Sequence, residues 1–161
     1  MNLSGSCHCG AIRFSVQSRT PYPFMRCHCS ICRKTAGGGG YAINLMGAAD
    51  TLVCEDPNGA QNTYQAIIDG EQSPAQRVFC GSCGSHLWLW DPRWPELIHP
   101  QASAIDTPLP VTPETVQIML DAKPSWVDLA TSAPEKRFDT YPDLSIEDWH
   151  KTHGLYESDD P

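Results

Sequence analysis

The chain has 161 residues, and its 19 acidic and 11 basic side chains give a formal charge of −8. This length corresponds to about one domain, and the negative charge disfavours polyanionic partners because phosphate contacts need clustered lysine and arginine. The longest basic stretch is Arg33-Lys34, no apolar run reaches membrane-spanning length, and the first residues lack the apolar segment of a signal peptide. We therefore expect a cytoplasmic protein in a reducing compartment that binds neither nucleic acid nor membrane. The sequence does not indicate an oligomeric state.

The first two thirds of the chain indicate short strands. Fourteen prolines and twelve glycines divide the sequence into small pieces, which favours a loop-rich β protein over a helical bundle. Ile12, Phe14 and Val16 alternate with polar residues, as in a strand with one side facing solvent. A helical turn over 30–35 should begin at Ser30 and end at a run of four glycines. Further strands are expected at 24–26, 41–46, 51–54, 63–68, 77–80, 86–90 and 115–120.

The remaining segments predict a loop and a short helix. From Pro92 to Pro113 prolines recur too often for regular structure, so we expect a long loop there. Ser145, with an acidic residue three positions later, resembles a capping box, and Gly154 is a typical helix stop, which predicts a helix over 146–153. We divide the chain into a domain at 1–130 and a C-terminal extension at 131–161 that holds this helix and an acidic tail.

Seven of the eight cysteines form three tight clusters: Cys7 with Cys9, Cys27 with Cys29 and Cys32, and Cys80 with Cys83. Thiols so close in sequence are better placed to share one metal ion than to form unstrained disulfides. The first and last clusters together supply a closed four-thiolate zinc site, whose binding energy would act as folding energy. The alternative is that one of these pairs is merely buried or redox-active, since C-x-x-C also occurs in thiol oxidoreductases.

The middle cluster supplies three thiolates, whereas tetrahedral zinc needs four ligands. Water or a substrate thiol would complete an open site. A closed site would instead take its fourth ligand from elsewhere in the fold: Cys54, His28, His86 or His99. We disfavour His28, because its neighbours on both sides are ligands and its ring should point away from the ion. We expect Cys54 to be a small core residue, while His8 and His28 either hydrogen-bond the thiolates or face solvent.

Three segments then resemble a known family: GSCHCGAIRF at 5–14, CHCSICRK at 27–34 and FCGSCGSHL at 79–87. In this order they are similar to the glutathione-dependent formaldehyde-activating enzyme (GFA) and centromere protein V family. The resemblance implies a mainly β fold of several short coiled antiparallel sheets around zinc, called a β-tent, here followed by the short C-terminal helix. It also implies two zinc ions per chain, a structural one on the four-cysteine set and a labile one on Cys27, Cys29 and Cys32.

The same resemblance implies a carbon–sulfur lyase that acts on adducts of a glutathione-like thiol with an aldehyde, such as S-hydroxymethylglutathione. Cys27, Cys29 and Cys32 are then the catalytic residues, because an open zinc can hold a thiolate or polarise a carbonyl. Arg33, Lys34 and Arg77 are candidate cations for the carboxylates of glutathione. The competing hypothesis is a non-catalytic interaction module with two structural zincs, and a thiol-redox protein is disfavoured because the cysteines divide into zinc sites.

Overall fold

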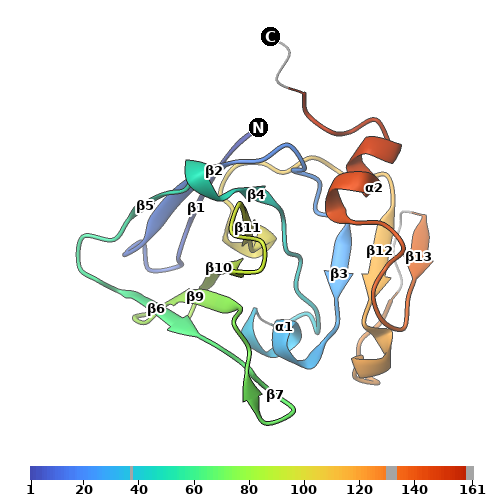
Figure 1. Ribbon diagram of the computed structural model, residues 1–161, viewed down its shortest axis with the longest axis horizontal. Coiled ribbons are helices and arrows are strands. Elements are labelled where there is room, and N and C mark those ends of the chain that lie inside the picture. Colours follow the sequence, from blue (N-terminus) through green and yellow to red (C-terminus); the bar gives the residue numbers. More distant parts are fainter. Residues whose placement is uncertain (37, 130–133, 159–161) are drawn as a thin grey trace.

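The computed structural model describes residues 1–36, 38–129 and 134–158. Within these residues the chain is mainly β, with two short α-helices (Figure 1). The strands are β1 Asn2–Ser6, β2 Arg13–Gln17, β3 Met25–Cys27, β4 Gly47–Ala48, β5 Val53–Glu55, β6 Gln61–Tyr64, β7 Ile67–Ile68, β8 Glu71–Gln72, β9 Gln76–Cys80, β10 His86–Trp90, β11 Leu97–Pro100, β12 Thr115–Ile118 and β13 Glu135–Arg137. The helices are α1 Ser30–Thr35 and α2 Ile146–Thr152, and 3-10 turns lie at Ala49–Thr51, Ala102–Ala104 and Leu120–Ala122. In the described ranges no helix is both long enough and apolar enough to span a bilayer.

Three of the sheets are antiparallel. The first contains β1, β2 and β5 in that order, and the second contains β4, β11, β10, β9 and β6. A two-stranded sheet of β7 and β8 extends from the end of β6. These short sheets and the helix near the C-terminus confirm the expected mainly β fold.

The remaining sheet, β13, β12 and β3, is parallel, which was not expected. In it Ile118 lies opposite Cys27, and Thr115 lies opposite Glu135. Parallel neighbours need a long crossover, and here residues 28–114 separate β3 from β12. The sequence of a three-residue strand such as β3 carries no local signal for the direction of a partner so far along the chain.

Two further expectations were wrong in detail. The predicted loop from Pro92 to Pro113 contains β11, an inner strand of the five-stranded sheet. Its proline, Pro100, is the last residue of the strand, so the missing N–H donor weakens only the end of the ladder. The predicted strand at 41–46 is reduced to isolated bridges, of which Ala42 pairs with Cys27.

Two separate hydrophobic cores hold the sheets together. The first lies between the two larger antiparallel sheets, where Phe14 meets Trp88 edge to face at 5.1 Å between ring centroids. The second lies between the parallel sheet and α2, where Trp149 stacks on Phe24 at 3.8 Å. Figure 1 shows this division, with the parallel sheet and α2 on one side and the other strands opposite.

The C-terminal helix forms as its sequence predicts. The hydroxyl of Ser145 accepts a hydrogen bond from the backbone N–H of Asp148 at 3.0 Å, and Gly154 follows the helix with φ of 66°. The chain beyond the helix returns to the N-terminus, where Glu157 contacts the amino group of Met1. This part of the expected acidic tail is therefore attached to the fold, and 159–161 lie outside the described residues.

Candidate metal centres

The first candidate centre brings together Cys7, Cys9, Cys80 and Cys83, whose sulfur atoms all lie within 4.8 Å of one another. The sulfur of Cys9 is 3.5 Å from that of Cys7 and 3.7 Å from that of Cys80. A tetrahedral zinc with Zn–S bonds of about 2.3 Å needs sulfurs about 3.8 Å apart. The four side chains therefore fit a four-thiolate zinc.

Two tight turns position these cysteines. After β1, the N–H of Ile12 donates to the Cys7 sulfur at 3.3 Å, and Gly10 turns the chain with φ of 75°. After β9, the N–H of Gly84 donates to the carbonyl of Cys80 at 2.7 Å. Gly84 has φ of 77°, a conformation that favours glycine. Turns of this kind leave the thiols on the inner side of the bend, where they converge.

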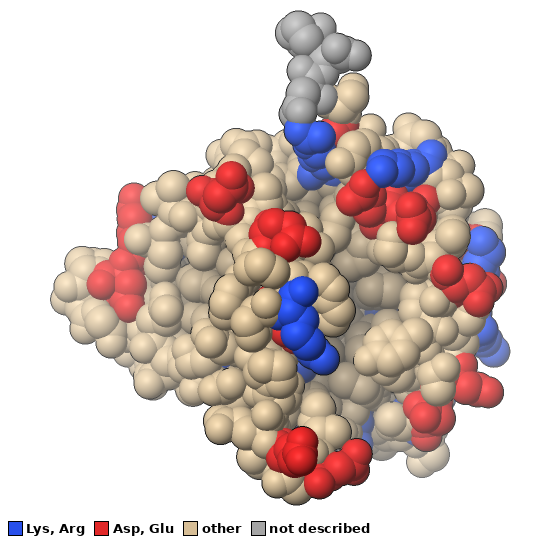
Figure 2. Space-filling model, viewed as in Figure 1, with Lys and Arg blue, Asp and Glu red and all other residues tan. Residues whose placement is uncertain are grey.

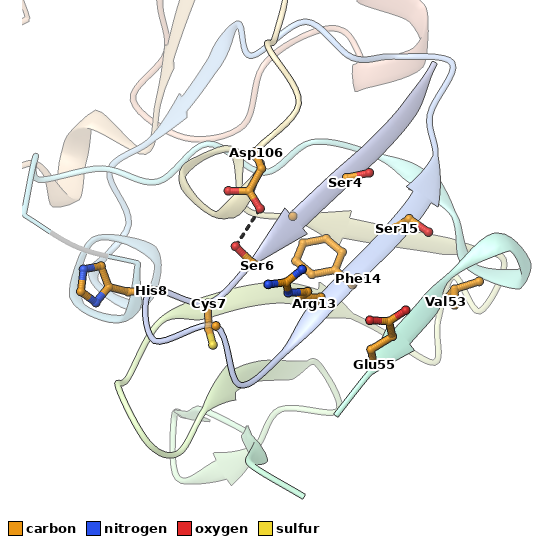
Figure 3. Close-up of a pocket in the computed structure, with 12 residues that line it drawn as sticks. Ser4, Ser6, Cys7, His8, Arg13, Phe14, Ser15, Val53, Glu55 and Asp106 are labelled. Carbon is orange, nitrogen blue, oxygen red and sulfur yellow. Dashed lines mark hydrogen bonds between the residues drawn. The ribbon is translucent and has the colours of Figure 1, made fainter. Parts of the chain in front are cut away.

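Ser85 joins the two turns, a role that the sequence did not reveal. Its hydroxyl lies 3.2 Å from the Cys83 sulfur and accepts a hydrogen bond from the backbone N–H of His8 at 3.1 Å. The Ser85 hydroxyl and its backbone N–H lower the pKa of Cys83 to about 5, which favours the thiolate that a metal requires. The His8 side chain is exposed, and Figure 3 shows its ring turned away from Cys7.

The second candidate centre brings together Cys27, Cys29 and Cys32, again with all sulfurs within 4.8 Å. Cys27 ends β3, Cys29 caps α1 and Cys32 lies within α1. The helix begins at Ser30 as predicted, but its cap is Cys29, whose sulfur accepts from the Cys32 N–H at 3.3 Å. The Cys27 and Cys32 thiols and this N–H lower the pKa of Cys29 to about 2. The N–H of Cys32 therefore favours a thiolate at Cys29, the charge state that a metal ligand requires.

None of the four residues considered as a further ligand joins this cluster within the part of the chain that the structure describes. His28 is buried between the Gln117 side chain at 2.7 Å and the Gly40 carbonyl at 3.2 Å. His99 bonds the Leu45 carbonyl at 3.0 Å. Cys54 is not a core residue as expected, because the edge strand β5 leaves its side chain exposed.

Buried polar groups surround the second centre, and sequence patterns identified few of them. The amide of Asn44 points to the Cys32 sulfur at 3.9 Å, and Gln101 donates to the Asn44 oxygen. Arg77 of β9 is 8% exposed, and its guanidinium acts electrostatically on the Cys32 thiol. The same guanidinium acts on His86 of β10, whose pKa is lowered to about 4, first by burial. Asn44 and Gln101 carry no motif by which sequence alone could find them.

Two cavities lie on other parts of the described chain. One, of about 610 Å³, lies against β1, β2 and β5 beside Cys7, where Ser6 donates to Asp106 at 2.7 Å (Figure 3). Another, of about 1040 Å³, lies near the N-terminus and Glu157. Neither is lined by the second cysteine cluster. Any chemistry at the second cluster therefore lies apart from these two cavities, whereas Cys7 of the first cluster lines one of them.

Comparisons with known proteins agree with this arrangement. The sequence profile of the family described as "Glutathione-dependent formaldehyde-activating enzyme" matches residues 2–121. A Halomonas elongata protein named "Putative glutathione-dependent formaldehyde-activating enzyme" is 60% identical over 159 residues, which cover 98% of this chain and 99% of that protein. A crystal structure of a Rhodobacter sphaeroides protein is similar with a TM-score of 0.53 and 25% identity, covering 68% of this chain and 92% of that one. The chain therefore belongs to the glutathione-dependent formaldehyde-activating enzyme family.

Proposed function

We propose that this protein is a zinc-dependent enzyme of the carbon–sulfur lyase type that acts on the adduct of glutathione, or a similar thiol, with formaldehyde or a similar aldehyde. The observation that carries the proposal is the second cluster. Three thiols converge there without a fourth ligand from the described residues, and buried polar groups surround them. Membership of the family supports a glutathione-dependent, aldehyde-related function.

The two clusters take different roles in this proposal. Cys7, Cys9, Cys80 and Cys83 hold a structural zinc, because they join β1 to β9 and two of them are buried in the first core. Cys27, Cys29 and Cys32 hold a labile, catalytic zinc. A zinc bound there would supply a Lewis acid that favours the thiolate form of a coordinated thiol.

The chain's own residues then bind and orient the substrate. Arg33 and Lys34 lie in the last turn of α1, directly after Cys32, and offer cations to the two carboxylates of glutathione. A substrate thiol approaches the second cluster from the side of Cys29, because Cys29 is the least buried of the three cysteines. Arg77 is too deeply buried to meet a peripheral carboxylate, so only a small group beside the second cluster can reach it.

The state of the cysteines supports a cytoplasmic location, and the surface charge supports small-molecule partners. All eight cysteines are free thiols, which fits the reducing conditions of the cytoplasm. On the face shown in Figure 2, Lys and Arg side chains are interspersed with acidic ones and form no continuous stripe. This distribution supports small-molecule partners rather than nucleic acid.

Cobalt(II) in place of zinc tests the proposal. Addition of glutathione should change the d–d bands of the cobalt protein, and the zinc protein should accelerate exchange between formaldehyde and its glutathione adduct, measured by nuclear magnetic resonance. Cys32→Ser should abolish the acceleration. Cys54→Ala is the matched control, because Cys54 is exposed and outside both clusters. An unchanged cobalt spectrum together with exchange at the uncatalysed rate would instead favour an interaction module with two structural zincs.

A further inference from the structure

Four buried side-chain atoms have no hydrogen-bond partner in the part of the chain that the structure describes: Arg33 Nε, Arg77 Nη1, His86 Nδ1 and Gln101 Oε1. They are not scattered. Arg33 follows Cys32 in α1, Gln101 reaches Cys32 through Asn44, and Arg77 acts electrostatically on both Cys32 and His86. Because buried polar atoms are nearly always bonded, this concentration at the second cluster indicates a bound ligand.

Arg77 supplies a hydrogen-bond donor. Its side chain is buried in the sheet on β9, and it forms no ion pair with a carboxylate among the described residues. A buried guanidinium without a partner is costly unless a ligand or a nearby anion compensates for it. The thiolates of the second cluster provide the negative charge, while Nη1 still has a hydrogen to donate.

His86 supplies a hydrogen-bond acceptor. Its Nε2 lies 3.2 Å from the carbonyl oxygen of Trp88, and a carbonyl only accepts, so Nε2 carries the hydrogen. Burial lowers the pKa of His86 to about 4, so the ring is neutral at pH 7. Nδ1 is then a lone pair, buried and unpartnered. In the antiparallel pairing of β9 with β10, His86 lies opposite Phe79, two residues along β9 from Arg77, and the Arg77 guanidinium acts electrostatically on the His86 ring.

We propose that Arg77 and His86 form a binding pair for the hydroxyl group of the thiol–aldehyde adduct. Arg77 Nη1 donates to the hydroxyl oxygen, and the hydroxyl hydrogen is donated to His86 Nδ1. This inference rests on the proposed function, and it adds the reason for specificity: a hydroxyl can satisfy both atoms at once, whereas a thioether cannot. A site built to bond a hydroxyl strongly rejects an analogue that lacks it.

The test compares two probes on the zinc-loaded protein by isothermal titration calorimetry. The first is glutathione premixed with one equivalent of formaldehyde, and the second is S-methylglutathione, which lacks the hydroxyl. Arg77→Met removes the donor, and His86→Gln removes the Nδ1 acceptor while its amide replaces the Nε2 donor. Each substitution should weaken binding of the adduct by about 10-fold or more and leave the affinity for S-methylglutathione unchanged. Arg13→Met, an exposed arginine on β2, is the matched control and should change neither affinity.

Zinc content and thermal melting give readouts that do not depend on ligand. Both variants should keep two zinc ions and melt within a few degrees of the parent protein, because Arg77 Nη1 and His86 Nδ1 have no hydrogen-bond partner among the described residues. Equal weakening for both probes, or loss of zinc, would show that the pair supports the cluster or a carboxylate and would overturn this inference alone. A parent protein that binds neither probe would refute the proposed function as well.

Discussion

Substitution of one cysteine from each cluster should separate a folding role from a chemical role. Cys80 is fully buried in the first core, and its sulfur lies 3.7 Å from that of Cys9, which is 71 residues away. A cross-link that closes a loop of about 70 residues is worth about 4 kcal/mol by the chain-entropy relation, and structural zinc binding is worth on the order of 10 kcal/mol. Domains of this size are stable by only about 5–15 kcal/mol. Cys80→Ser should therefore unfold the protein.

Cys29→Ser should leave the fold intact. The second cluster spans residues 27–32, so a metal there closes only a short local ring. Serine also replaces the sulfur as the acceptor at the helix cap, so the cost to α1 stays below about 1 kcal/mol. This variant should lose one zinc and all acceleration of adduct exchange while it keeps its circular dichroism spectrum.

Metal analysis and urea denaturation followed by circular dichroism measure both effects. The parent protein should hold two zincs, Cys29→Ser one, and Cys80→Ser should show an unfolded spectrum before urea is added. Cys54→Ser, at an exposed cysteine outside both clusters, should match the parent protein. If the two cluster variants lose equal stability, the division into structural and catalytic zinc is wrong.

Three further predictions concern stability and binding. Burial lowers the pKa of His150 below 6.5, so on acidification the unfolded state binds the proton before the folded state does. The contribution of His150 to the free energy of unfolding should be fully present above pH 6.5 and should fall as the pH drops below that value. In urea titrations at pH 5 to 7, His150→Gln should flatten this pH dependence. Trp149→Ala should lower the free energy of unfolding by about 3–5 kcal/mol, because the indole is buried and stacked on Phe24. The control Trp126→Ala, at a side chain that is 67% exposed, should lower it by less than about 0.5 kcal/mol. Equal losses in the two variants would contradict the assignment of Trp149 to the second core. Anisotropy titrations should find no submicromolar binding to DNA or RNA at physiological salt, because −8 net charge leaves few phosphate contacts.

The sequence predicted which cysteines converge in the structure, because much of this convergence is local. Cys7 and Cys9, like Cys80 and Cys83, lie within three positions of each other, so each turn delivers two sulfurs whatever the rest of the fold does. The C-terminal helix was predictable for the same reason, since the Ser145 cap acts within one turn.

The polar surroundings of the second cluster were not predictable because they depend on pairing between distant segments. Asn44 reaches Gln101 through a single bridge, and the proline-rich sequence around Gln101 concealed β11. Arg77 and His86 do lie in strands that the sequence predicted. However, a register shift between His86 and Trp88 sets the direction of the His86 side chain, and alternation along the strand gives no sign of it.

The parallel sheet also determines the order in which the protein can assemble on the ribosome. Both halves of the first metal cluster have been synthesised once residue 83 emerges, so that centre can close early. β3, which ends in Cys27, must wait for β12 at Thr115–Ile118, and the stacking of Trp149 on Phe24 comes later still. Chains emerge at about 5–20 residues per second, so the second cluster spends several seconds without its neighbouring strand. During that interval its three thiols belong to a nascent chain in which all four cysteines of the first cluster are already present.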